Sequence, residues 1–129
     1  MKSVVRFRTG DGVYAVPVEN AREVLAPTGL TPLPSPHPDV AGLLEREGGA
    51  LTILSALGAG RQHVLVLDAG DRPFGLLVEE VMGVDRIDET ALAPPPAGQH
   101  DPVIAGVIDS GHGMVLLVDV ANLAGRLQP

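Results

Sequence analysis

The sequence reads Val5-Arg6-Phe7-Arg8-Thr9-Gly10-Asp11-Gly12-Val13-Tyr14-Ala15-Val16-Pro17-Val18 near its start, two short apolar runs joined by a Gly-Asp-Gly turn. Val5 and Phe7 share one face of an extended chain, and Tyr14 and Val16 do the same after the turn, because side chains alternate along a strand. Glycine supplies the backbone freedom that a tight reversal needs. The stretch therefore predicts a β-hairpin.

The other apolar runs are also strand-length, rich in Val, Leu and Ile, and bounded by Gly, Pro or Asp, which is typical of strands joined by turns. We expect further strands at 22–26, 40–46, 50–54, 63–68, 74–81, 83–87, 103–109 and 114–119. Helix is expected only in short pieces, near Ser55 to Leu57 and over Val120 to Leu127, where Ser55 and Asp119 can serve as N-caps. The sequence predicts an all-β protein.

The domain organisation expected from this pattern is a single domain over residues 1–129 with two similar halves, 1–60 and 61–129. Each half carries roughly five strands and can close into a small barrel, which removes exposed sheet edges. The proline-rich stretch Thr31 to Pro38 lacks the backbone donors of a sheet ladder, so we expect an extended surface connection there.

Composition excludes several classes of protein. The sequence has no cysteine, which rules out thiolate nucleophiles, Cys-ligated metals and disulfides. Nine Lys and Arg against sixteen Asp and Glu give a net charge of −7, and aromatic residues make up 2%, so no nucleic-acid partner is expected. Arg6 and Arg8 interrupt the apolar start, and no run approaches the ~20 residues of a membrane span. We expect a cytoplasmic protein without membrane insertion.

No catalytic or metal site is predicted, and no cofactor is expected. The four histidines share no i, i+4 spacing, which argues against a metal site; they are His37, His63, His100 and His112. The neighbouring carboxylates Glu79-Glu80 and Asp88-Glu89 point to opposite faces if they lie on strands, so solvated rim charges are the better interpretation.

Segments along nearly the whole chain occur in an order that resembles the CheW family. They are Tyr14 to Val18, Ala21 to Val24, Leu33-Pro34, Phe74 to Val81, Ile104 to Val107 and Met114 to Leu123. The resemblance implies two packed five-stranded Src homology 3-like barrels with a short C-terminal helix. It also implies a non-catalytic scaffold that couples the cytoplasmic helical tips of chemoreceptors to the regulatory domain of a CheA-type sensor histidine kinase.

For the receptor, the resemblance implies a groove formed by Glu23, Val24 and Leu25 beside Leu43. A helical tip needs an apolar trough with polar rims, and these residue types supply both. The alternative is that Val24 and Leu43 are ordinary core residues and Glu23 a solvated rim charge.

The segment Gly42 to Gly48 departs from the family pattern Gly-Val-x-Asn-Leu-Arg-Gly. Here Glu45 replaces the Asn and Glu47 the Arg. In the family that Arg belongs to the surface where receptor and kinase contacts meet, so like charge is expected to weaken binding to an ordinary receptor tip.

For the kinase, the predicted surface consists of Val81, Met82 and Val84. Methionine adapts to irregular partner surfaces, which suits such a site. The alternative for Met82 is a place in the core.

Two other functions stay open at this point. One is a divergent paralogue that serves twitching or other surface motility with an altered receptor contact. The other is a small ligand-binding barrel or enzyme, with a pocket between the halves and His37 or His100 in it. An adaptor should carry apolar grooves on its outside, whereas an enzyme should bring desolvated titratable groups together.

Overall fold

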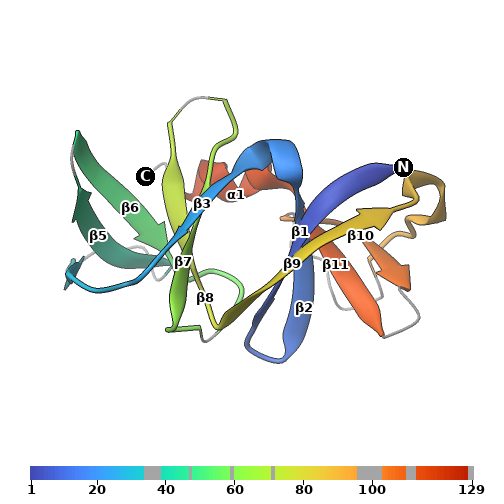
Figure 1. Ribbon diagram of the computed structural model, residues 1–129, viewed down its shortest axis with the longest axis horizontal. Helices are drawn as coiled ribbons and strands as arrows, with labels where there is room; N and C mark the ends of the chain where they lie inside the picture. The colour runs from blue at the N-terminus through green and yellow to red at the C-terminus, as the bar shows by residue number, and fades with distance from the viewer. Residues whose placement is uncertain are drawn as a thin grey trace.

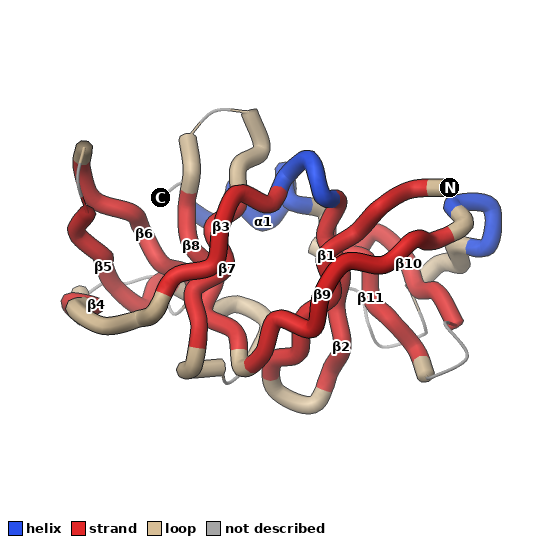
Figure 2. Tube along the Cα trace, in the orientation of Figure 1, coloured by secondary structure: helices blue, strands red, loops and turns tan. Residues whose placement is uncertain are grey.

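The structure is a computed structural model that describes residues 1–33, 39–46, 48–58, 60–70, 72–95, 103–109 and 113–127. Strands dominate these residues, and helix is confined to short segments (Figure 2). The longest helix among them, α1 (Val120–Ala124), has five residues. The all-β prediction is confirmed.

Five strands form the first sheet, sheet A, in the order β10-β11-β2-β1-β9. They are β1 (Lys2–Thr9), β2 (Gly12–Pro17), β9 (Glu80–Ile87), β10 (Ile104–Asp109) and β11 (Met114–Val118). The hairpin expected at the start of the chain is present, with β1 antiparallel to β2 and Thr9 opposite Gly12. Ala93, downstream of β9, exchanges two backbone hydrogen bonds of 2.9 and 2.8 Å with Val107 of β10. This bridge brings the two ends of the sheet together into a barrel.

Six strands form the second sheet, sheet B, in the order β3-β7-β8-β6-β5-β4. They are β3 (Ala21–Leu25), β4 (Leu30–Pro32), β5 (Val40–Arg46), β6 (Gly49–Leu54), β7 (His63–Leu67) and β8 (Phe74–Val78). Although β3 and β5 are not neighbours in the sheet, Arg46 Nη2 lies 3.1 Å from Glu23 Oε2. Sheet B is therefore curled, and side chains close it where backbone pairing does not.

Strand β4 was not expected, because the prolines around it argued for a plain connection. The prediction was wrong for Thr31 and Pro32, which together with Leu30 pair with β5. Proline is tolerated here because β4 is an edge strand and needs no donor on its outer side. The close pairing also requires a glycine opposite, since a Cβ on Gly42 would clash with the carbonyl oxygen of Thr31. Residues 34–38 lie outside the described part of the chain.

The two sheets share one apolar core. Its fully buried members come from both sheets and from α1; they include Phe7, Val16, Leu54, Leu65, Leu67, Phe74, Leu76, Val118 and Leu123. Figure 1 shows the sheets side by side with α1 between them. The predicted pair of small packed barrels is confirmed, with a sixth strand added to the second.

The division into halves at residue 60 differs from the observed arrangement. The chain passes from sheet A to sheet B between β2 and β3 and returns between β8 and β9 (Figure 1). Sheet A thus combines the two ends of the chain, and sheet B is built from its middle. The sequence did not indicate this assignment of strands to sheets, because both halves carry similar apolar runs and the alternation of residues does not say which strands pair.

Only some of the expected helical segments are present. Asp119 accepts a hydrogen bond of 3.0 Å from the backbone nitrogen of Asn122 and caps α1 as expected. The expected helical turn at Ser55 to Leu57 is absent, since these residues form a loop and a bend. Instead, 3₁₀ turns occur at η1 (Val18–Asn20), η2 (Glu89–Ala91) and η3 (Gly125–Leu127).

Candidate docking clefts

An apolar cleft lies where the two sheets meet, with a volume of about 270 Å³. We call it the inter-sheet cleft. It is lined by β1, η1 and β9 on one side and by β3 and β7 on the other, through Val5, Val18, Ala21, Arg22, Glu23, Val24, Leu65, Val81, Gly83 and Val84. Apolar side chains outnumber charged ones in this lining, so the cleft suits an apolar occupant.

The rim valines of the inter-sheet cleft are exposed. Val24 keeps 45% of its surface accessible and Val84 keeps 68%. The alternative that Val24 is an ordinary core residue is therefore wrong. Two sets of residues that the sequence assigned to different partners meet here, with Glu23 and Val24 opposite Val81 and Val84.

Met82 does not line the inter-sheet cleft, although Val81 and Val84 on either side of it do, and a β-bulge explains this spacing. Along β9, Val81 pairs with Phe7 and Gly83 with Arg6, so Met82 is an extra residue between them. The extra residue shifts the regular alternation, so Val81 and Val84 lie on the same face of β9. Met82 is 39% exposed, so the alternative of a core position is wrong for it as well.

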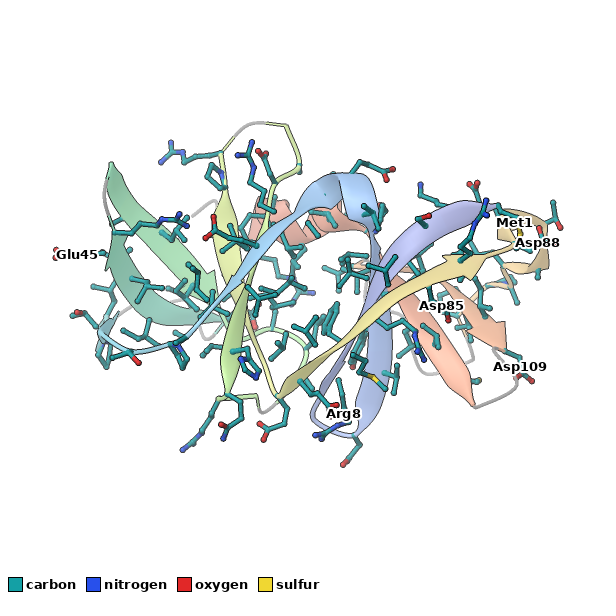
Figure 3. All side chains as sticks on the ribbon, viewed as in Figure 1. Met1, Arg8, Glu45, Asp85, Asp88 and Asp109 are labelled. Atoms are coloured by element: carbon teal, nitrogen blue, oxygen red, sulfur yellow. The ribbon has the colours of Figure 1, made fainter. Side chains whose placement is uncertain are left out.

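The other residues predicted for the receptor surface are spread over different places. Leu43 is half-buried and lines none of the clefts described here. Leu25 and Glu45 border an open hollow between β5 and the end of β3 with the loop that follows it. Figure 3 shows Glu45 at the outer end of the molecule, pointing away from sheet A. Glu47 lies outside the described residues.

A second cleft, of about 360 Å³, lies on sheet B, and sequence reasoning missed it. We call it the arginine cleft. Its lining comes from β3, β5, β6, β7 and the loops that join β5 to β6 and β7 to β8. It consists of Arg22, Glu23, Arg46, Gly48, Gly49, Ala50, Leu51, Val66, Arg72 and Pro73. The three arginines are at least 24 residues apart in sequence, and only the curl of sheet B brings them to one place.

Two of these arginines are held by carboxylates. Arg22 Nη2 lies 2.7 Å from Asp68 Oδ2, and Arg46 Nη2 lies 3.1 Å from Glu23 Oε2. Asp68 also accepts a 2.7 Å hydrogen bond from the backbone nitrogen of Gly70. This bond from Gly70, with the Arg22 guanidinium beside it, holds the pKa of Asp68 below its ordinary value. Asp68 is thus a fixed anion that orients Arg22.

The carboxylate of Asp88 also has a structural role. Asp88 accepts hydrogen bonds from the side chain and backbone of Thr90, which lower its pKa and cap η2.

Within the described segments, no group of three or more His, Asp or Glu side chains is placed to hold a metal ion. His63 is exposed, whereas His37, His100 and His112 lie outside these segments. In the same segments, none of the helices has the length and apolar character needed to cross a membrane.

Comparison with known proteins gives a consistent set of relatives. The family model described as the CheW-like domain matches residues 3–128. Protein FrzA of Myxococcus xanthus is 33% identical over 71% of this chain, and the match spans 63% of FrzA. The chemotaxis protein CheW of Rhizobium meliloti is 26% identical over 95% of this chain and 86% of its own length.

A solved structure supports the same assignment at the level of the fold. The crystal structure of the scaffolding protein TtCheW from Thermoanaerobacter tengcongensis superposes with a TM-score of 0.80. It covers 92% of this chain and 84% of TtCheW at 18% sequence identity. With two interlocked β-barrels and a family match over nearly its full length, this chain belongs to the CheW-like domain family.

Proposed function

We propose that this protein is a non-catalytic cytoplasmic adaptor that couples a chemoreceptor to a CheA-type sensor histidine kinase. The observation that carries the proposal is the inter-sheet cleft, an apolar trough with the exposed valines Val24 and Val84 on its opposite sides. Its relatives include proteins named for chemotaxis and for scaffolding. A binding protein of this kind needs an external groove and no reactive group.

The occupant we propose for the inter-sheet cleft is the helical tip of the receptor. An amphipathic helix places apolar side chains three and four residues apart along one face, and such a row fits an apolar groove. Arg22 and Glu23 lie beside the valines and supply a polar rim for the solvated flanks of the helix. Glu23 is itself held by Arg46, so this rim is ordered before the partner arrives.

The kinase then requires a different surface. A helix in the inter-sheet cleft would cover Val81 and Val84, so these two residues cannot also bind the kinase in the same complex. Met82 does not line this cleft and is exposed. We therefore assign Val81 and Val84 to the receptor and keep Met82 as the contact of the kinase's regulatory domain.

An enzyme or a ligand-binding barrel is less well supported. The clefts of the described residues open on the outside of the sheets rather than enclosing a polar pocket. The carboxylates with lowered pKa, Asp68 and Asp88, are explained by local turn and cap hydrogen bonds. Neither arrangement points to acid–base chemistry on a substrate.

The experiment is a reconstitution with a soluble receptor tip fragment and the kinase from the same source cell. With the receptor fragment immobilised, we expect the kinase to be retained only when this protein is added, and Val84→Asp to abolish the effect. Met114→Asp is the matched control, because Met114 is 55% exposed on β11 and lines neither cleft. Binding to neither partner, or equal loss with both variants, would contradict the proposal. Identification of the kinase also separates a chemotaxis array from one that serves surface motility.

A further inference from the structure

We propose that the arginine cleft is a second docking site, which binds a carboxylate side chain together with a neighbouring apolar side chain of a protein partner. The site borders the inter-sheet cleft along β3, with Arg22 and Glu23 in both linings, but it does not depend on the identity of the receptor. It is formed within sheet B, between the β5–β6 and β7–β8 connections.

The charges of the described residues favour an anion. The chain as a whole carries a net charge of −7 with nine Lys and Arg, and three of these nine line this one cleft. Glu23 and Asp68 balance two of the three guanidiniums. No hydrogen bond or ion pair joins Arg72 to another described residue, so the positive charge of Arg72 is unbalanced among these residues. Arginine presents a planar fork of donors that matches a carboxylate.

The wall of the arginine cleft is apolar. Leu51 and Val66 are buried members of the sheet B core, and Ala50 and Pro73 lie beside them on the surface. A free inorganic anion gains nothing from such a wall. A peptide segment that carries Glu or Asp next to Leu or Val uses both the cation and the wall.

A single excess charge also argues against a polyanion. Nucleic acid or a nucleoside triphosphate brings several phosphates, and their binding depends on neutralising many charges at once. Here the carboxylates Glu23 and Asp68 stand next to the guanidiniums and would repel the remaining phosphates. The cleft therefore fits one carboxylate on an otherwise apolar segment.

The experiment titrates the ¹⁵N-labelled full chain with an end-blocked peptide in which one glutamate is flanked by leucines. The matched peptide carries glutamine in its place. We expect saturable shifts of the backbone amides of Gly49 and Ala50 with the glutamate peptide. Arg72→Gln should weaken this binding by about two- to fivefold, the range for a solvent-accessible ion pair. Arg61→Gln should leave it unchanged, because Arg61 is exposed but does not line the cleft.

Three outcomes would overturn the inference. The first is equal binding of the glutamine peptide, which would show that no carboxylate is recognised. The second is an unchanged affinity in Arg72→Gln with its fold intact. The third is saturation by inorganic phosphate without any response to the peptide, which would make the cleft a simple anion site. None of these results bears on the inter-sheet cleft, so the proposed adaptor function would stand or fall separately.

Discussion

The two clefts share the strand β3 and differ in nearly everything else. Arg22 and Glu23 border both of them, so β3 forms a ridge between an apolar trough and a cationic one. The inter-sheet cleft is made by two sheets that pack together, whereas the arginine cleft is made by one sheet that curls. The same strand thus borders two clefts of different chemistry, because the barrel of sheet A lies on one side of it and the curl of sheet B on the other.

The difference has energetic consequences. Burial of apolar surface contributes roughly 25 cal/mol per Å² and depends little on salt at moderate ionic strength. Contacts between exposed charges are worth about 1 kcal/mol or less and are screened within about 10 Å at 0.1 M salt. The inter-sheet cleft should therefore supply affinity, and the arginine cleft should supply selectivity and a faster encounter.

The largest effect is expected from Val84→Asp. The substitution places a carboxylate where a receptor helix would bury an exposed valine, and it should weaken binding of the receptor tip by about 2 kcal/mol or more. Unfolding by urea should change little, because the side chain is exposed in the free protein. Calorimetry with the receptor fragment measures the first quantity. A loss of the same size in Met114→Asp would show that acidity alone, rather than the cleft, is responsible.

An effect of intermediate size is expected when the salt concentration is raised. When the concentration rises from about 0.05 M to about 0.5 M, binding of the glutamate peptide to the arginine cleft should weaken several-fold, since exposed charges are screened. Binding of the receptor tip should change much less. Parallel titrations at both concentrations test the contrast. Equal salt dependence would mean that the two clefts do not differ in the way described.

A smaller effect is expected from the ion pair that closes sheet B. In a double-mutant cycle of Glu23→Gln and Arg46→Gln, the coupling should be about 0.2–1 kcal/mol, because both side chains are more than one-third exposed. Urea unfolding of the four proteins gives this number. If the two substitutions lower the free energy of unfolding additively, the ion pair is present in the curled sheet but does not stabilise it.

The smallest effect is expected for the pH-dependent contribution of Asp68 to the stability of the fold. Its folded pKa is lowered by the Gly70 and Arg22 contacts, so the charged form stabilises the fold above the unfolded value of about 4. That contribution is lost as the pH falls through the lowered folded pKa. Asp68→Asn should therefore unfold at a lower temperature than the parent at about pH 6, and the gap should narrow below about pH 4. A gap that stays constant with pH would argue against a charged Asp68.

Strands that show alternating apolar and polar residues could be predicted from the sequence. Features that depend on which strands pair with each other could not. The hairpin of β1 and β2 was predictable because the turn and both strands lie within one short stretch. Strand β4 was not, since its prolines are acceptable only at an edge, and a linear pattern does not show where the edges are.

The candidate sites follow the same rule. Val24 was predictable as a surface residue only through resemblance, and its exposure then supported the interpretation. The bulge that places Val81 and Val84 on the same face of β9 depends on the register with β1, which the sequence does not reveal. The arginine cleft left no local signal, because Arg22, Arg46 and Arg72 meet only through the curl of sheet B.

Site-directed cross-linking tests the central claim most directly. The chain has no cysteine, so a single one can be introduced at a chosen place and labelled with a photo-reactive group. We expect Val24→Cys and Val84→Cys, on opposite sides of the inter-sheet cleft, to cross-link to the same face of the receptor's helical tip. Met114→Cys, exposed on β11, should give no such product. Efficient cross-linking from residue 114, with none from 24 and 84, would contradict a receptor helix in the inter-sheet cleft.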